Sequence, residues 1–295
     1  MRLGFDACGI AEVATADEAC SNYDQWIAEG CQAGMNYMER HRDVRLNPKK
    51  LLAGARSIIS VALNYYPAQK LSEDVPHIAY YAYGNDYHEV MKAKLKQLSA
   101  VIDGDCRAFA DAVPLFERFW AVQAGLGWIG KNSNLIIPHR GSYFFLGEII
   151  TTAVFDYDKP FQKDLCGTCH KCLDACPTGA LCERRRVDAR RCFNYLTIEN
   201  HDAEIPSAEA AKLGNRFYGC DSCQIACPWN RFSIPTKEKA FEPSPDFLSL
   251  NYKTLKNLTA ADYQRIFGSS AMQRAKYDGL IRNARYLQGK DSDAS

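Results

Sequence analysis

Nine of the thirteen cysteines in this 295-residue chain lie in one stretch, between Cys166 and Cys227. The stretch shows little apolar periodicity, so it can bury little core and needs bound metal to hold it together. Thirteen is an odd number, and the first residues lack the basic-then-apolar pattern of a secretory signal, so a disulfide framework is not expected. Clustered thiols of this kind predict a metal centre in a reducing compartment, which we expect to be the cytoplasm.

Two cysteine motifs indicate the kind of metal. They read Cys166-x2-Cys169-x2-Cys172-x3-Cys176-Pro177 and Cys220-x2-Cys223-x3-Cys227-Pro228. Spacings of two residues let thiolates converge on one iron–sulfur cube, whereas the x3-Cys-Pro that follows directs the last thiolate to a different cluster. Two such motifs are typical of bacterial two-cluster ferredoxins, so the stretch predicts two [4Fe–4S] clusters.

The motifs supply one thiolate fewer than two cubane clusters need. Cys192 is the best additional ligand, because Cys182 follows Cys176-Pro177 too closely. We therefore predict that cluster one is held by Cys166, Cys169, Cys172 and Cys227. Cluster two is predicted to be held by Cys176, Cys192, Cys220 and Cys223. Cys182 is left as a buried or free thiol.

Two other interpretations of the motifs are less consistent with the sequence. The run Cys-Gly-Thr-Cys-His that starts at Cys166 matches the attachment motif of c-type haem. Haem attachment would require export, and it leaves Cys172 and Cys176 unexplained. A four-cysteine structural zinc site is the second alternative, and the x2-x2-x3-Cys-Pro spacing disfavours it.

The rest of the chain has the composition of a globular protein, with 47% hydrophobic and 24% charged residues. No run approaches ~18 apolar residues, so neither a membrane span nor a membrane partner is expected. Up to about residue 160, apolar β-rich runs alternate with helical patterns. Strands are expected over 57–63, 135–137 and 141–152, and helices over 85–102 and 114–124. A helical tail is expected over 259–287.

These patterns predict an α+β protein, although an α/β arrangement of the first domain stays open. The expected divisions are an N-terminal α/β-type domain over 1–160, a ferredoxin-like domain with two clusters over 161–235, and a short C-terminal helical segment over 236–295.

Three shorter patterns in the first domain each have a functional and a structural interpretation. Residues 125–130 fit the dinucleotide motif G-x-G-x-x-G, but they follow a helical segment, so a tight turn presenting Lys131 and Asn132 is favoured. Residues 86–91 resemble a cobalt-binding D-x-H-x-x-G motif without its final glycine, and an ordinary helix start is favoured. Asp111 stands between a strand and a helix, where it is either an N-cap or a general acid.

Taken together, these residues make the chain resemble the epoxyqueuosine reductase family. The matching stretches include Leu3-Gly-Phe-Asp-Ala-Cys-Gly-Ile10, Ala124-Gly-Leu-Gly-Trp-Ile-Gly-Lys-Asn132, both cysteine motifs, and residues 83–88, 141–143, 146–148, 192–199 and 214–220. The resemblance implies a cobalamin-binding catalytic domain followed by two [4Fe–4S] clusters. It also implies reduction of epoxyqueuosine to queuosine in the anticodon loop of tRNA, with electrons passing through the clusters to cobalamin.

The family's functional residues can be carried over only where this sequence matches. By resemblance, Asp111 is the proton donor and also lies against the cofactor. Cobalamin contacts are implied, by the same resemblance, at Arg45, Ala79, Leu135, Leu146 and Asn194.

Charge bears on the implied tRNA partner. Lys and Arg number 36 against 35 Asp and Glu, so the chain as a whole does not attract nucleic acid. Any tRNA must be bound by local basic segments, over 184–191 and 251–295. An unidentified electron donor is also implied, and a monomer is expected.

Two alternatives stay open from the sequence. One is a corrinoid and iron–sulfur reductase of another electrophile, similar to reductive dehalogenases. The other is a non-enzymatic electron carrier of the ferredoxin type, which leaves about 160 N-terminal residues without a task.

Overall fold

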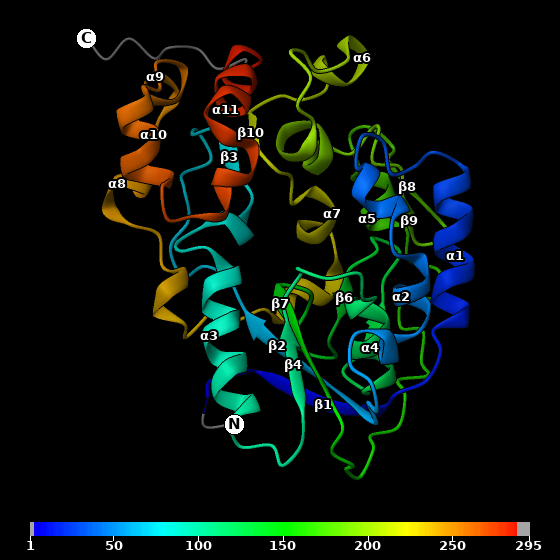
Figure 1. Ribbon diagram of the computed structural model, residues 1–295. Helices are drawn as coiled ribbons and strands as arrows, with labels where there is room; N and C mark the ends of the chain where they lie inside the picture. Colours follow the sequence, from blue (N-terminus) through cyan, green and yellow to red (C-terminus); the bar gives the residue numbers. More distant parts are fainter. Residues whose placement is uncertain (1–2, 288–295) are drawn as a thin grey trace.

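The computed structural model describes residues 3–287, and its centre is a four-stranded sheet (Figure 1). The strands lie in the order β1 (Ala7–Glu12), β2 (Ser57–Asn64), β7 (Phe144–Thr151) and β4 (Cys106–Phe109). Every neighbouring pair is antiparallel. Because consecutive parallel strands with crossover helices are the mark of α/β proteins, this sheet settles the first domain as α+β.

The sheet is covered on both faces, which explains why β2 is buried along its whole length. Helix α3 (Tyr87–Ser99) packs on one face, against Val61 and Ile149. Helix α4 (Glu117–Gln123) packs on the other, where Ile58 and Ile150 meet Trp120. The two helices lie on opposite sides of the sheet in Figure 1. A central strand buried on both faces needs a nearly continuous apolar run, as residues 57–63 provide.

The expected elements of this domain are confirmed, all with shorter bounds except β2, which extends one residue beyond the expected 57–63. The helix expected over 85–102 is α3, and the side chain of Asp86 caps it by accepting the backbone N–H of His88 at 3.0 Å. The helix expected over 114–124 begins only at Glu117. The strand expected over 135–137 is the short β6 (Leu135–Ile136), which pairs with β5 (Trp128–Ile129). Helices α1 (Asp17–Ala28) and α2 (Arg42–Leu46) complete the domain.

The glycine-rich turn before β5 has a structural role. A Cβ atom on Gly127 would lie 2.0 Å from the carbonyl oxygen of Ile136, so only glycine permits this close approach of the hairpin. Gly125 has a φ of +77°, in the left-handed region that glycine adopts readily. The turn directs Lys131 and Asn132, the two residues that it is expected to present, into the protein interior, where both are buried.

The cysteine-rich segment consists of short elements joined by turns. They are α5 (Lys171–Asp174), β8 (Leu181–Cys182), β9 (Arg186–Val187), the π-helix η4 (Tyr195–Glu199), α6 (Ser207–Ala210), β10 (Arg216–Tyr218) and α7 (Ser222–Ile225). Strand β10 pairs in parallel with β3 (His77–Ile78) of the N-terminal segment. The two segments therefore share a sheet.

The C-terminal helices close over this pairing. They are α8 (Pro245–Leu248), α9 (Tyr252–Lys256), α10 (Ala260–Phe267) and α11 (Lys276–Arg285). The fully buried side chains of Phe267 and Leu280 pack in one core with Ile78 and Phe217. The helical tail expected over 259–287 is confirmed as α10 and α11. Within residues 3–287, no helix has the length and apolar character needed to cross a membrane.

Candidate iron–sulfur and acid site

The eight cysteines predicted as ligands lie in two separate groups of four. Burial raises the pKa of the Cys172 thiol to about 11, and its nearest thiol neighbours are Cys227 and Cys166. Cys227 in turn has Cys166 and Cys169 beside it. These four are the cluster-one cysteines. They come from both motifs, as the x3-Cys-Pro spacing predicts.

The second group forms around Cys192. Burial raises the pKa of its thiol to about 11, and Cys220 and Cys176 are its thiol neighbours. The thiol of Cys223 has Cys220, Cys192 and Cys176 beside it, and burial again raises its pKa. These four are the cluster-two cysteines. Cys182 is exposed and belongs to neither group.

The cluster-one cysteines line a cavity of about 260 Å³, together with Lys131, Ile136, Trp229 and Phe232. A partly open, largely apolar space bounded by four thiols suits an iron–sulfur cube, whose thiolate ligands surround it. Among residues 3–287, no three His, Cys, Asp or Glu side chains gather closely enough to hold a single metal ion. The Nζ atom of Lys131 forms an ion pair with Glu183 at 3.0 Å.

The first domain contributes a hydrogen bond to this cavity. Trp128 Nε1 donates to Cys166 Sγ at 3.4 Å. A hydrogen bond to a ligand sulfur stabilises the reduced, more negative cluster. We expect Trp128→Phe to make the reduction potential of cluster one more negative by ~40 mV, which corresponds to about 1 kcal/mol for one electron. Potentiometric titration followed by EPR spectroscopy measures this shift.

Trp229 supplies the matched control for that prediction. Its ring packs against Trp128 with centroids 5.0 Å apart, but its Nε1 donates to the Leu165 carbonyl at 3.3 Å rather than to a sulfur. Trp229→Phe should leave the potential unchanged. Equal shifts in both variants would show that packing, and not the hydrogen bond, sets the potential.

The cluster-two cysteines are held by side chains that bond to the backbone between them. Asn194 Oδ1 accepts the N–H of Cys220 at 2.7 Å, and Thr197 Oγ1 accepts the N–H of Gly219 at 2.9 Å. Asn283 on α11 donates to the carbonyls of Thr197 and Phe217. The C-terminal helix therefore fixes the loops that carry Cys192 and Cys220.

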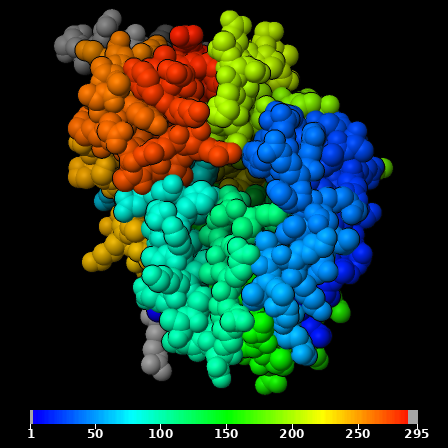
Figure 2. Space-filling model, viewed as in Figure 1, coloured from blue at the N-terminus to red at the C-terminus, as the bar shows by residue number. Residues whose placement is uncertain are grey.

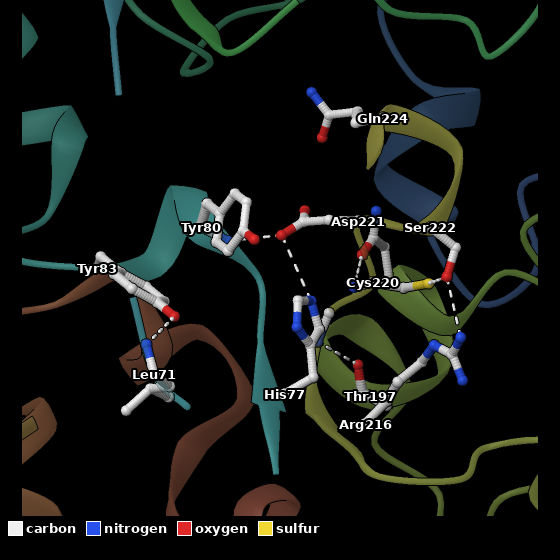
Figure 3. A network of polar contacts seen from close by, with 12 residues as sticks. Leu71, His77, Tyr80, Tyr83, Thr197, Arg216, Cys220, Asp221, Ser222 and Gln224 are labelled. Carbon is white, nitrogen blue, oxygen red and sulfur yellow. Dashed lines mark hydrogen bonds and ion pairs between the residues drawn. The ribbon is translucent and has the colours of Figure 1, made fainter. Parts of the chain in front are cut away.

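A buried carboxylate joins the second motif to β3 (Figure 3). Asp221 Oδ2 accepts the backbone N–H of Tyr80 at 2.8 Å and lies 3.4 Å from His77 Nε2. On the other side of the motif, Ser222 Oγ lies 3.3 Å from Cys220 Sγ and accepts a hydrogen bond from Arg216. These contacts help to position the cysteines of the second motif.

Asp111 lies two residues beyond β4, in the left-handed region with a φ of +53°. Its backbone N–H donates to Glu117 Oε1 at 2.6 Å, and its Oδ2 accepts the hydroxyl of Tyr87 at 2.7 Å. Burial raises the pKa of Tyr87, and Asp111 adds to the shift, so the phenol keeps its proton as a donor. Helix α4 is preceded by Phe116, so the N-cap interpretation of Asp111 is wrong.

The residues expected to contact cobalamin fall in three places. Arg45 is buried beside Tyr23 and Phe116, and its Nε has no hydrogen-bond partner. Leu135 and Leu146 belong to the core under α4. Ala79 and Asn194 both contact the position that a side chain on Gly219 would occupy. The unpartnered guanidinium atom of Arg45 suits a polar cofactor, and the individual contacts stay predictions.

In Figure 2 a hollow opens where the blue N-terminal segments, the cyan-to-green segments and the red C-terminal segment meet. Asp111 belongs to the cyan-to-green part of the chain and is exposed. Tyr37 is 47% exposed, and its hydroxyl interacts with Glu199 at 3.5 Å. Arg274 stacks over the Tyr37 ring at 5.8 Å and pairs with Glu199 at 2.7 Å. Asp111 is close enough to contribute to the raised pKa of Tyr37, after burial and Glu199.

The arginine run over 184–191 is partly engaged within the chain. Arg185 pairs with Asp164, Arg186 with Glu29 and Arg190 with Asp188. The second basic segment, over 251–295, includes residues 288–295, which lie outside the described residues. Within it, Arg282 is buried and donates to the carbonyls of Leu196 and Asn200, so it is structural.

Sequence reasoning missed two carboxyls next to Asp111. Glu117 was seen only as part of a helix, and Glu148 only as part of a matching stretch. The available signal was a glutamate within Phe-Phe-Leu-Gly-Glu-Ile-Ile-Thr, an otherwise apolar strand. A charged residue type inside a fully buried strand is rare unless it is paired.

Comparisons with known proteins agree with this arrangement. Residues 45–112 match the family model described as epoxyqueuosine reductase QueG, DUF1730, and residues 165–230 match the 4Fe-4S double cluster binding domain. The chain is 44% identical to an epoxyqueuosine reductase from Cyclobacterium marinum, over 99% of this chain and 95% of that one. It is also 44% identical to one from Synechocystis sp., over 94% and 98%.

Solved structures give the same result. A crystal structure of epoxyqueuosine reductase with an epoxyqueuosine-modified tRNA-Tyr stem loop matches with a TM-score of 0.86 and 32% identity, over 97% of this chain and 77% of that one. A structure of the Bacillus subtilis enzyme, with its catalytic aspartate loop swung out of the active site, matches with a TM-score of 0.84 over the same shares. The segment over 165–230 binds two [4Fe–4S] clusters, and the chain is an oxidoreductase that belongs to the epoxyqueuosine reductase family.

Proposed function

We propose that this protein reduces epoxyqueuosine to queuosine in the anticodon loop of tRNA, with cobalamin bound in the hollow beside Asp111. The observation that carries this proposal is the separation of eight cysteines into two sets of four, in a chain whose first domain presents the exposed carboxyl of Asp111. Cluster one would be held by the cluster-one cysteines and cluster two by the cluster-two cysteines.

Removing an epoxide oxygen as water takes two electrons and two protons. Bound cobalamin would supply a strongly reducing centre, fed through the two clusters. The chain's own part is to hold the substrate and to protonate the departing oxygen. Asp111 is the candidate for that proton, because its carboxyl is exposed and is oriented by the Tyr87 hydroxyl.

The hollow also offers groups that would hold a modified nucleoside. Tyr37 presents an exposed ring for stacking, and Arg274 lies over it. Stacking of a splayed base on an aromatic ring is the usual mode of single-stranded RNA recognition. Glu199 accepts two hydrogen bonds from Arg274, at 2.8 and 2.7 Å, and these bonds hold the Arg274 guanidinium over the Tyr37 ring.

The affinity for the tRNA phosphate backbone is expected to fall as the salt concentration rises. Within residues 3–287, Arg184 and Arg191 have no ion-pair partner, so they are free to bind phosphates. We expect the Arg184→Ala/Arg191→Ala variant to bind tRNA more weakly and to reduce the salt slope of the affinity by about 2. Lys92→Ala is the control, because Lys92 is an exposed cation on α3, outside both basic segments. Fluorescence anisotropy across a salt series measures both slopes.

The direct test is anaerobic incubation of the reconstituted protein with reductant and epoxyqueuosine-containing tRNA, followed by nucleoside analysis. Queuosine should accumulate only when both cobalamin and the clusters are present. Absence of queuosine from a protein that carries all three groups would overturn the proposed reaction. If the protein instead reduced small halogenated compounds, in the absence of tRNA, as fast as it reduces epoxyqueuosine, the alternative of a reductase with another substrate would be favoured.

A further inference from the structure

Glu148 is a carboxyl buried in the middle of the central sheet. It lies on β7 with no exposed surface, and neither of its carboxylate oxygens receives a hydrogen bond from an N–H or O–H donor. Ser60 stands opposite it on β2, and Phe109 on β4. The Ser60 hydroxyl is also buried and without a partner. An ionised carboxylate in this position would cost several kcal/mol of solvation free energy.

The side chain that meets Glu148 is the carboxyl of Glu117, in the first turn of α4. Leu146 and Ile150 lie in the core under α4. Side chains two residues apart point to the same face of a strand, so Glu148 also points toward α4. Two adjacent carboxyls in an apolar core cannot both ionise at modest cost, so they share a proton. Burial, followed by Glu117, raises the pKa of Glu148.

The hydrogen bonds decide where the shared proton resides. Glu117 Oε1 accepts the backbone N–H of Asp111 at 2.6 Å, which stabilises an anion at Glu117. Glu148 has no such donor, so it retains the proton and directs its O–H at Glu117. This arrangement leaves Glu117 a charge-assisted acceptor for the Asp111 backbone.

The hydrogen bond from the Asp111 N–H to Glu117 matters because Asp111 adopts a backbone conformation that is unfavourable for a residue with a side chain. Its φ is +53°. Such a conformation is strained for a residue with a Cβ atom and persists only where surrounding contacts hold it. Glu117 supplies that contact at the backbone, and Tyr87 supplies one at the carboxyl. Loss of either would release the residue from its place beside the hollow.

We propose that Glu117 and Glu148 form a proton-sharing pair that holds the Asp111 loop in its active position, with Glu117 as the positioning residue and Glu148 as its buried donor. The inference deepens the proposed function, because it rests on Asp111 acting in the reaction.

A pH dependence follows from this pair. Burial, followed by the charge of Asp111, raises the pKa of Glu117. As the pH falls through that raised value, Glu117 gains a proton, its bond to the Asp111 N–H loses its charge assistance and weakens, and the loop is held less firmly. Turnover should therefore fall on the acid side. The charged and titratable groups that face Glu117 are Asp111, Glu148, Arg118, Tyr87 and His88.

The test compares Glu117→Ala, Glu117→Gln and Glu148→Gln with Glu89→Ala, an exposed carboxyl on α3 that serves as the control. We expect Glu117→Ala to lower kcat by roughly 10- to 100-fold with an unchanged KM for modified tRNA. Glu117→Gln should keep a higher kcat than Glu117→Ala, because its amide oxygen accepts the same N–H. Its kcat should match the level that the wild type reaches below the acid-side fall, because the amide carries no charge. It should also lose the acid-side fall, because an amide does not titrate. Glu148→Gln should stay near wild type, since its amide N–H replaces the carboxyl O–H.

Amide hydrogen exchange of the peptide over 106–116 gives a readout that needs no turnover. Glu117→Ala should speed exchange at Asp111, whereas Glu89→Ala should not. Unchanged exchange and kcat in Glu117→Ala, or an acid-side fall that persists in Glu117→Gln, would overturn the inference. If Asp111 itself proves dispensable for turnover while the exchange result holds, the proton-donor assignment fails and the pair remains a structural latch.

Discussion

Replacement of Asp111 by asparagine is expected to lower turnover of epoxyqueuosine-containing tRNA by about 10²- to 10⁴-fold, the usual contribution of a general acid. The amide oxygen of asparagine can still accept the Tyr87 hydroxyl, and the backbone bond to Glu117 is unaffected. The loop should therefore keep its position, and only the transferable proton is lost. Single-turnover assays with prereduced protein measure this effect apart from electron supply.

The control for that experiment is Asp103→Asn, an exposed residue in the turn before β4. Cobalamin absorbance and iron content should be unchanged in both variants. Turnover of Asp111→Asn within a few-fold of wild type would place the acid at another residue. Tyr87 would then be the first candidate, since its hydroxyl already points to the same position.

Replacement of Cys192 by alanine is expected to remove cluster two and to halve the iron and sulfide bound per chain. Cys192 is the predicted ligand outside both motifs, and the other three cluster-two cysteines cannot complete the cube without it. Because metal binding and folding are coupled in such segments, the variant should also unfold at a lower temperature. Iron and sulfide analysis with EPR spectroscopy of the reduced protein distinguishes the two clusters.

Cys182→Ala is the matched control, because Cys182 lies ten residues earlier and is exposed. It should retain the full iron content and both EPR signals. If Cys182→Ala lost a cluster while Cys192→Ala kept both, the assignment of the eighth ligand would be reversed. Loss of both signals in Cys192→Ala would instead show that the two clusters assemble together.

The grouping of the cysteines into two sets of four could be predicted because the spacings within each motif are short. Spacings of two and three residues determine which thiols can reach one cube, and Cys192 followed from counting the remaining thiols. The direction of Lys131 could not be predicted in this way, because the packing of the β5–β6 hairpin turns it toward the cluster-one cavity.

The contacts of Asp111 likewise depend on residues that are distant in the sequence. Glu117 follows it by only six residues, but Glu148 and Tyr87 come from a different strand and a different helix. Only the antiparallel register of β7 with β4 places Glu148 opposite Phe109, just before the acid. Likewise, β3 is two residues long and carries no periodicity that would reveal its pairing with β10.

The pairing of β3 with β10 means that the cluster-binding segment cannot be separated from the rest of the chain without loss of structure. Asp221, between two cluster-two cysteines, binds the backbone of Tyr80, and the C-terminal helices build their core on Ile78 and Phe217 together. The cluster-binding portion therefore cannot be exchanged as an independent unit. A chimera that received the corresponding stretch of an unrelated two-cluster ferredoxin would lose a strand partner, a buried carboxylate and much of the C-terminal core in a single exchange.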